Sequence, residues 1–397
     1  MKETTRETSE EKRKLEEQKE AWLSRSGLTK GRERELAFRA FDILMGNLYP
    51  REGYPWSPYR LFTPGIGKFN GVWNWDTAFH AMGVRHWDAT LAKENILGFL
   101  AFEKEDGLLP DVVEESGEII SSYSKPPVFA KATELVYRAD RDVDFIKKAY
   151  PALVKNEAFW REKRCENELF YYSSDSNGTD KYDPLTRAKY ESGWDDSPRW
   201  DEGMDWYPID LNCFMVDFYR SLAFLANELG YKGEAEEWKT RETRLAEHIN
   251  SRMWSEENGC YADLHRRDGR LSDVLTPASF MPLFVRIATV ERAEKAAELA
   301  EKRFGKRMPT VAFDHPAYSK GYWRGPTWLN VAYFAAKGLK NYGLPVAEDI
   351  REWVLNACDK EKRGIFENYD SVTGEGLYFP RFSWSCVFLI EFLLNWE

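Results

Sequence analysis

The sequence predicts an all-α protein with an (α/α)6 toroid, a single ring of six helical hairpins. Apolar residues recur at three- and four-residue spacing in about twelve segments, strand signals are sparse, and consecutive segments are joined closely enough to be antiparallel neighbours. A solenoid of helical repeats is the competing architecture, but no consensus of fixed period links one helical pair to the next. The closed ring is therefore favoured.

The expected helices follow one another to the end of the chain. The clearest span residues 33–45, 91–103, 128–139, 143–164, 211–228, 232–253, 290–304, 327–340, 346–358 and 384–395, and shorter candidates lie near 76–84 and 278–287. Short charged turns, such as residues 139–142, alternate with long loops rich in aromatic residues. We expect the long loops to gather at one end of the ring.

Residues 1–30 are expected to form a charged leader or helix, and residues 31–397 a single catalytic domain. The run from Lys2 to Lys19 mixes both signs of charge with almost no apolar residue, which is typical of a solvated helix or a frayed leader. No apolar signal-peptide core follows it, and no apolar stretch of about eighteen residues occurs. The expected compartment is the cytoplasm.

Charge and composition narrow the function classes. The net charge of −10 disfavours nucleic acid and anionic membranes, which are bound through concentrated Lys and Arg. The five cysteines lack C-x-x-C spacing and the five histidines lack H-E-x-x-H, so we expect no disulfide framework, metal site or cofactor. Residues 177–179 match an N-glycosylation sequon, interpreted as chance. The 16 tryptophans favour a small carbohydrate as partner, although most single tryptophans are expected to be packing.

Four loops concentrate Trp, Asp, Glu, Arg and Gly beyond what helix packing requires. They span residues 69–76, 191–200, 321–328 and 366–376. In the first loop, Asp76 lies beside Trp75 and close to Trp73. It is either the N-cap of the next helix or a carboxylate that holds two adjacent sugar hydroxyls, and both roles are compatible.

The second loop offers a general acid. Asp195 and Asp196 are consecutive and point in different directions, so at most one is expected to face a pocket. A carboxyl group beside Trp194 would lose solvent, which raises its pKa as a general acid requires. The alternative interpretation of this loop is a charged surface turn.

The third and fourth loops offer further charged groups. Arg324 either pairs with a structural carboxylate, holds a catalytic carboxylate ionised, or binds an acidic aglycone. Glu367, Asp370 and Glu375 compete for the role of base, and composition does not choose among them. Paired carboxylates on separate loops are what glycosidic cleavage needs, because one protonates the leaving oxygen while the other activates water or attacks. No nucleophile elbow, Walker A loop or Rossmann fingerprint competes with this interpretation.

From about Tyr54 to the C-terminus, the chain resembles glycoside hydrolase family 63. The family's motifs occur in order: W-x-W-D at 73–76, S-K/Q-P-P at 124–127, E-S-G-x-D at 191–195, Y-W-R-G at 322–325, and E-N-Y-[DN]-x-x-T-G at 367–374 with F-S-W at 382–384. The resemblance implies an (α/α)6 barrel and inversion at the anomeric carbon. It also implies that Asp195 is the general acid and Glu367 the general base.

The expected sugar-binding residues lie in or beside these motifs. They are Trp73, Trp75, Asp76, Lys125, Trp194, Arg199, Trp323, Arg324, Tyr369 and Trp384. In its compact size the chain is similar to bacterial hydrolases of mannosylglycerate and glucosylglycerate. Those enzymes tend to have Gln at the position of Lys125, whereas Lys also occurs in relatives that act on α-glucosyl disaccharides. The expected substrate is therefore a short α-glucoside or α-mannoside, cleaved in exo fashion, and the aglycone stays open.

Two other functions compete with hydrolysis. Sugar epimerases and isomerases also use (α/α)6 barrels, and fold alone does not fix function. They generally rely on His as acid and base, and none of the four loops contains His. A non-catalytic carbohydrate-binding protein is the third possibility, against which the intact Asp195 and Glu367 argue.

Overall fold

The computed structural model describes residues 9–173 and 182–396. The sequon at residues 177–179 and the first eight residues of the expected leader lie outside the described residues. Within the described residues, no helix combines the length and the apolar character needed to cross a membrane. The chain is mostly helical, and its strands are two or three residues long.

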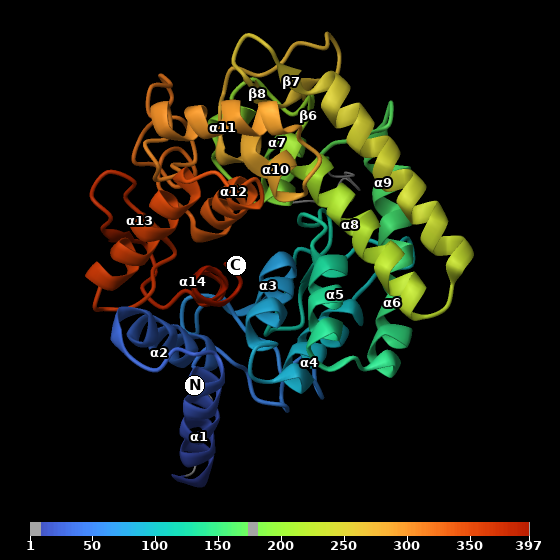
Figure 1. The fold of residues 1–397 in the computed structure, drawn as a ribbon. Coiled ribbons are helices and arrows are strands. Elements are labelled where there is room, and N and C mark those ends of the chain that lie inside the picture. Colours follow the sequence, from blue (N-terminus) through green and yellow to red (C-terminus); the bar gives the residue numbers. More distant parts are fainter. Residues whose placement is uncertain (1–8, 174–181, 397) are drawn as a thin grey trace.

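Six helices form the inner ring of the barrel. They are α3 (Asn74–Val84), α5 (Phe129–Asp140), α8 (Ile209–Glu228), α10 (Met281–Phe284), α12 (Leu329–Asn341) and α14 (Ser383–Leu394). Each packs against the next in chain order, and α14 packs against α3 to close the ring (Figure 1). The expected (α/α)6 toroid is confirmed.

Six further helices form the outer ring and alternate with the inner ones along the chain. They are α2 (Gly31–Met45), α4 (Ala89–Leu100), α6 (Val143–Lys163), α9 (Lys232–Arg252), α11 (Val290–Lys302) and α13 (Val346–Lys360). These twelve helices match the expected segments to within a few residues, except near 278–287. There, a 3-10 turn, η2 (Pro277–Phe280), precedes the four-residue α10.

The burial pattern explains which helices lie inside. Every residue of α14 from Ser383 to Phe392 is buried, because this helix touches neighbours on all sides. In contrast, α9 buries only Ala235, Trp238, Leu245 and Ile249, a single stripe typical of a surface helix. An additional helix, α1 (Ser9–Arg25), packs on α2 through the buried Trp22 and Leu23.

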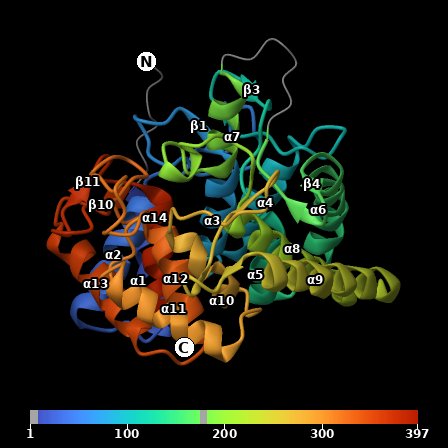
Figure 2. The same ribbon diagram turned by 90° about the horizontal axis from the view of Figure 1, so that it is seen from above.

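Long loops precede the inner helices, and short turns precede most of the outer ones. Because the inner helices run in the same direction, their long loops meet at one end of the barrel, as expected; Figure 2 shows β1, β3 and α7 there. These loops hold the short elements β1 (Gly71–Trp73), β2 (Val112–Glu114), β3 (Ile119–Ile120), β4 (Cys165–Glu166), β5 (Leu169–Phe170), α7 (Pro184–Ser192), η1 (Pro198–Trp200), β6 (Trp206–Tyr207), β7 (Trp254–Ser255), β8 (Cys260–Tyr261), β9 (Leu264–His265), β10 (Asn368–Tyr369) and β11 (Gly376–Leu377).

Antiparallel pairing ties neighbouring loops together. The loops before α3 and α5 share the sheet β1-β2-β3, in which Gly71 pairs with Glu114. The loops before α8 and α10 share the β6-β9 pair, and the loops before α12 and α14 meet in a bridge between Thr327 and Tyr369. The long loops at this end of the barrel are therefore connected to one another.

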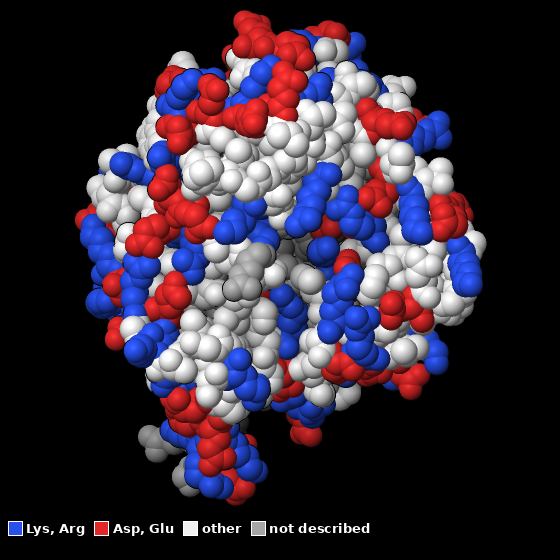
Figure 3. All heavy atoms as spheres, in the orientation of Figure 1, with Lys and Arg blue, Asp and Glu red and all other residues white. Residues whose placement is uncertain are grey.

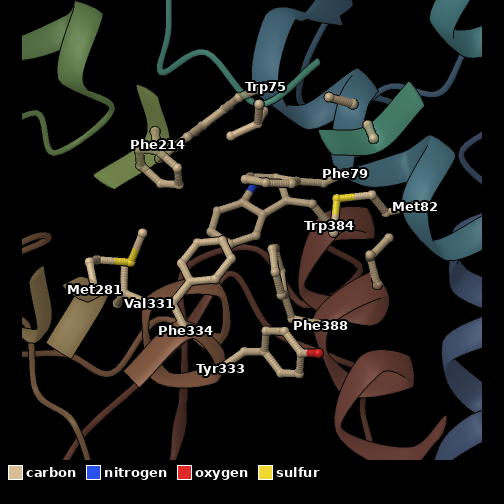
Figure 4. Close-up of a cluster of buried hydrophobic side chains, with 14 of the residues drawn as sticks. Trp75, Phe79, Met82, Phe214, Met281, Val331, Tyr333, Phe334, Trp384 and Phe388 are labelled. Carbon is tan, nitrogen blue, oxygen red and sulfur yellow. The ribbon is translucent and has the colours of Figure 1, made fainter. Parts of the chain in front are cut away.

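Aromatic side chains fill the barrel axis. Trp75 and Phe79 reach it from α3, Phe334 from α12, and Trp384 and Phe388 from α14 (Figure 4). The ring centroids of Phe79 and Phe388 lie 4.8 Å apart, and those of Phe334 and Phe388 lie 5.4 Å apart. The axis is a packed core.

The fifth position of the inner ring depends on a glycine. A Cβ atom added to Gly338 of α12 would lie 2.8 Å from the backbone nitrogen of Phe284 and 3.0 Å from the backbone oxygen of Phe280. The backbones of η2 and of the four-residue α10 lie directly against α12. The contact leaves no room for a side chain.

We predict that Gly338→Ala lowers the free energy of unfolding by about 1–3 kcal/mol, because the added methyl group meets backbone atoms. Gly233→Ala is the matched control, since Gly233 also lies in a helix but has open space where its Cβ would be. The control should be neutral or stabilising by about 0.4–1 kcal/mol. Urea unfolding followed by circular dichroism measures both, and equal stability of the two variants would contradict the packing argument.

Candidate active site

Four carboxyl groups and one amine converge where the long loops meet. We define the carboxylate cluster as Asp76, Asp111, Lys125, Asp195 and Glu367. Asp76 lies in the first turn of α3, Asp111 and Lys125 lie in the loop before α5, Asp195 follows α7, and Glu367 precedes β10. Their charges affect one another's pKa, which identifies them as one electrostatic group.

Asp76 is buried and does not cap its helix. The N-cap of α3 is Trp73, which makes no side-chain capping bond, so the N-cap role considered for Asp76 is not observed. Burial raises the pKa of Asp76 to about 7, and the charge of Lys125 partly opposes that shift. Its carboxyl group therefore carries a proton part of the time near neutral pH.

Lys125 is neutralised within the cluster. Its Nζ lies 3.2 Å from Oδ1 of Asp111 and also donates to the backbone oxygen of Tyr190. Burial disfavours the charged amine, but Asp111 and Asp195 outweigh that effect and raise the pKa of Lys125. The ammonium thus offsets carboxylate charge inside the site and is not an isolated cation.

Glu191 fastens two of the sequence motifs together. Its fully buried carboxylate accepts hydrogen bonds from the backbone of Ser124 at 3.1 Å and of Ser173 at 2.7 Å, and Nε of Arg164 donates to it at 3.1 Å. Gly193 then ends α7 in the left-handed region, at φ +73°, with the Trp75 ring 2.5 Å from where its Cβ would lie. Together these contacts fix the approach to Asp195.

Asp195 and Asp196 have different environments. Asp195 is partly buried, and its side chain makes no hydrogen bond or ion pair with the described residues. Burial raises the pKa of Asp195 to about 6, against the opposing charge of Lys125. Asp196 instead accepts the backbone N–H of Trp323 at 2.6 Å, so its carboxylate holds two loops together.

Glu367 faces the cluster, and its two rivals do not. The hydroxyl of Tyr322 donates to Oε1 of Glu367, which is 4% exposed. Asp370 accepts the backbone N–H groups of Val372 and Thr373 at 2.8 and 2.9 Å and pairs with Lys320. Glu375 is exposed.

Opposing effects set the pKa of Glu367. Burial raises it, the hydrogen bond from Tyr322 lowers it, and the charge of Asp195 raises it further. The phenol of Tyr322 stays neutral, because burial and Glu367 raise its own pKa far above the ordinary value. Tyr322 is therefore a fixed hydrogen-bond donor to this carboxylate.

Three of the expected sugar-binding tryptophans form a packed stack with Trp328, which was not among the expected residues. The ring centroids of Trp194 and Trp323 lie 5.2 Å apart, those of Trp323 and Trp328 3.9 Å apart, and those of Trp328 and Trp384 5.6 Å apart, each pair being stacked. Trp75 adjoins Trp384 at 6.1 Å. All five are at most 5% exposed, so they form a wall of the core beside the cluster. Trp73, in β1, stays partly exposed.

Three other expected residues have structural partners. Arg199 is buried and binds Asp210 and Asp263 at 2.7–3.0 Å through all three nitrogens of its guanidinium, so these two carboxylates neutralise its charge. Tyr369 is fully buried, and its hydroxyl contacts Sγ of Cys358 and the backbone of Phe366. Arg324 pairs with Asp201 at 2.6 Å, which is the structural role considered for it.

Two residues of the site were not expected from the sequence. Asp111 stands alone between two apolar segments, and no motif marks it. Tyr322 begins the Y-W-R-G motif, in which Trp323 and Arg324 were the expected sugar-binding residues. Within the described residues, no group of three or more His, Cys, Asp or Glu is arranged to hold a metal ion.

Comparisons with known proteins identify glycoside hydrolases that are similar to this chain. Residues 69–385 match the family model of the mannosylglycerate hydrolase MGH1-like glycoside hydrolase domain. A mannosylglycerate hydrolase of Rubrobacter radiotolerans is 25% identical over 84% of this chain and 92% of its own length. A periplasmic trehalase of Salmonella newport (strain SL254) is 26% identical, and the match covers 80% of this chain but only 64% of the trehalase.

The fold is also found in solved structures. The GH63 mannosylglycerate hydrolase from Thermus thermophilus, in complex with glucose, superposes with a TM-score of 0.76 at 24% identity, over 89% of this chain and 99% of that one. Neutral trehalase from Saccharomyces cerevisiae gives a TM-score of 0.71 at 19% identity, over 85% of this chain and 73% of that one. At these identities the likeness concerns the fold.

We predict that Tyr322→Phe raises the pKa of Glu367, because the carboxylate loses a hydrogen bond that stabilises its charged form. A bond of this kind contributes about 1.5–3 kcal/mol, or roughly one to two pKa units. Titration of 13C-labelled glutamate carboxyl groups by NMR measures the shift. Tyr378→Phe is the control, because Tyr378 packs edge-on against Tyr322 at 4.9 Å without a hydrogen bond to Glu367. An unchanged pKa in Tyr322→Phe would exclude the proposed donor.

Proposed function

The chain belongs to the mannosylglycerate hydrolase MGH1-like family of glycoside hydrolases, within family 63, and on that premise we propose that it is an inverting, exo-acting α-glycosidase. Asp195 is the general acid and Glu367 the general base. The observation that carries this proposal is the contrast between the two carboxyl groups. Asp195 has a raised pKa and makes no hydrogen bond or ion pair with described residues, whereas Glu367 accepts a hydrogen bond from Tyr322.

Asp195 has the properties of a general acid. Its pKa of about 6 leaves a large protonated fraction in mildly acidic solution, so it can donate to the leaving oxygen. Asp196 and Asp111 are engaged by Trp323 and Lys125, whereas the Asp195 carboxyl group is open to a ligand. The charge of Lys125 limits the rise in the pKa of Asp195. The carboxyl group can therefore both lose and regain its proton near pH 6.

Glu367 has the properties of a base that activates water. The Tyr322 hydroxyl and the backbone of Phe379 favour its ionised form, and Glu367 lies in the loop before α14, whereas Asp195 lies in the loop before α8. In an inverting enzyme the water attacks from the face opposite the leaving group, which requires carboxyl groups roughly 6.5–9.5 Å apart. With Asp195 as acid and Glu367 as base, water displaces the leaving group directly, without a covalent intermediate.

We propose a short α-glucoside or α-mannoside as substrate: glucosylglycerate, mannosylglycerate or an α-glucosyl disaccharide. The names of the relatives support this class, since they include mannosylglycerate hydrolases and trehalases. Lys125 is a poor partner for an acidic aglycone, because Asp111 already neutralises it. A carboxylated aglycone would have to use another cation. Lys68 fits this role because it is exposed and its charge reaches Glu367.

A hydrolysis panel of glucosylglycerate, mannosylglycerate, trehalose, kojibiose, nigerose and maltose tests the substrate class. NMR of the first product formed tests the stereochemistry. A β-anomer released first from an α-linked substrate is expected. Release of the α-anomer first would contradict inversion, and the absence of any hydrolysis across a wider glycoside panel would contradict the function itself.

We predict that Asp195→Asn and Glu367→Gln each lower kcat at least about a thousandfold, because each removes one of the two proton-transfer groups. Asp196→Asn is the matched control. Its Oδ1 can still accept the Trp323 N–H, so this variant should keep most activity. If Asp196→Asn is inactive and Asp195→Asn is active, the two roles are reversed. Urea unfolding checks that all three variants are folded.

We predict that kcat/KM falls above about pH 6, by tenfold per pH unit, because the acid must be protonated and the pKa of Asp195 is about 6. The activity should also fall in strongly acidic solution, where Glu367 becomes protonated. Since burial raises the pKa of Glu367 as well, the optimum should be mildly acidic. A pH–rate profile checks this, and constant kcat/KM from pH 6 to 9 would contradict Asp195 as the acid.

A further inference from the structure

A second cavity opens at the end of the barrel opposite the carboxylate cluster. It has a volume of about 490 Å³ and is lined by residues of all six inner helices, including the C-terminal parts of α12 and α14. Figure 3, which views this face, shows a hollow at its centre with Lys and Arg side chains around it. The size is sufficient for a small organic molecule.

The interior of this cavity is apolar. Phe79, Met82, Phe214, Tyr333 and Phe334 line it and are at most 7% exposed. Leu135 of α5 and Phe284 of α10 line it closer to the surface and are partly exposed. A ligand that reaches inside must therefore present an apolar body to these side chains.

The mouth of the cavity is cationic. Among the described residues, its lining includes the cations Lys131, Arg220, Arg286 and Lys337 and two carboxylates, Asp217 and Glu391. Both carboxylates are already engaged, Asp217 by Lys131 at 3.2 Å and Glu391 by Arg85 at 2.6 Å. Of these cations, Lys131 and Arg220 are paired as well, Lys131 with Asp217 at 3.2 Å and Arg220 with Glu242 at 2.7 Å.

Arg286 is the cation best placed to receive an anion. It is exposed, and its Nη2 donates to the amide oxygen of Asn341 at 3.0 Å, a neutral acceptor. Among the described residues, it forms no ion pair with a carboxylate. Burial lowers the pKa of the nearby Lys337, and the charge of Arg286 lowers it further. A bound anion would reduce this repulsion.

Aromatic packing separates the cavity from the carboxylate cluster. Trp75, Phe79, Phe334 and Trp384 pack across the axis between the two ends (Figure 4), and the void lined by Trp75 and Phe334 measures only about 10 Å³. A ligand in one end therefore cannot reach the other through the barrel.

We propose that this cavity is a ligand site distinct from the active site, and that it binds a small organic anion with an apolar body, such as a medium-chain carboxylate. The acyl chain lies against Phe214 and Phe334, and the carboxylate lies at the mouth beside Arg286. The charge at the mouth selects the anionic head group, and the apolar interior excludes simple inorganic anions.

Isothermal titration of octanoate into the full chain tests the proposal, with 1-octanol as the uncharged probe of equal length. Octanoate should bind at one site per chain, and octanol at least about tenfold more weakly. Arg286→Gln should weaken octanoate binding by about tenfold, the effect of one charge-assisted hydrogen bond. Lys302→Gln, which removes an exposed cation of α11 paired with Glu298, should leave it unchanged.

Two further variants locate the ligand. Leu135→Trp fills the cavity from α5 and should abolish binding, whereas Asp195→Asn should leave it unchanged. The proposal is wrong if octanoate does not bind, if Arg286→Gln binds it as tightly as the unaltered chain, or if Asp195→Asn loses it. Glycoside hydrolysis plays no part in these readouts, so failure of the proposed function would not affect them.

Discussion

The structure depends on the closure of the inner ring, where α14 packs against α3. Once six inner helices run in one direction around an axis, their N-terminal ends, and the loops that precede them, must lie together. This constraint brings Asp76, Asp195 and Glu367, from the beginning, middle and end of the chain, into one cluster. Glycines permit the close approaches that closure requires, as at Gly338, and buried aromatic rings fill the space that remains.

The carboxylate cluster brings together charged groups whose burial would be unfavourable without partners. Four carboxyl groups in a mostly buried setting would all favour protonation. Lys125 lowers the cost of charge for Asp111, Asp76 and Asp195 together, and Tyr322 does so for Glu367. As a result, Asp195 has a raised pKa and no hydrogen-bond partner among the described residues, whereas Glu367 has a fixed donor that favours its ionised form.

The helices could be predicted from the sequence because each has a long apolar stripe, and the ring followed from their number and spacing. The region near 278–287 was predicted as one helix but is a 3-10 turn followed by a four-residue helix, since periodicity does not register so short an element. The paired strands of two or three residues and the polar α7 are set by contacts between distant loops. Such contacts leave no local pattern.

For the candidate site, the sequence predicted which loops contribute to the carboxylate cluster better than which of their side chains face it. Asp195 and Glu367 belong to the carboxylate cluster, but Arg199 and Tyr369, from the same loops, are buried and contact Asp210 and Cys358. Neighbours in an irregular loop point in different directions, so only the folded backbone decides which faces the cluster. The stacked tryptophans have a consequence of another kind. Indoles 3.9 Å apart couple electronically, so the near-ultraviolet circular dichroism of this stack should depend on the relative orientation of the rings and report on the order of the loops that carry them.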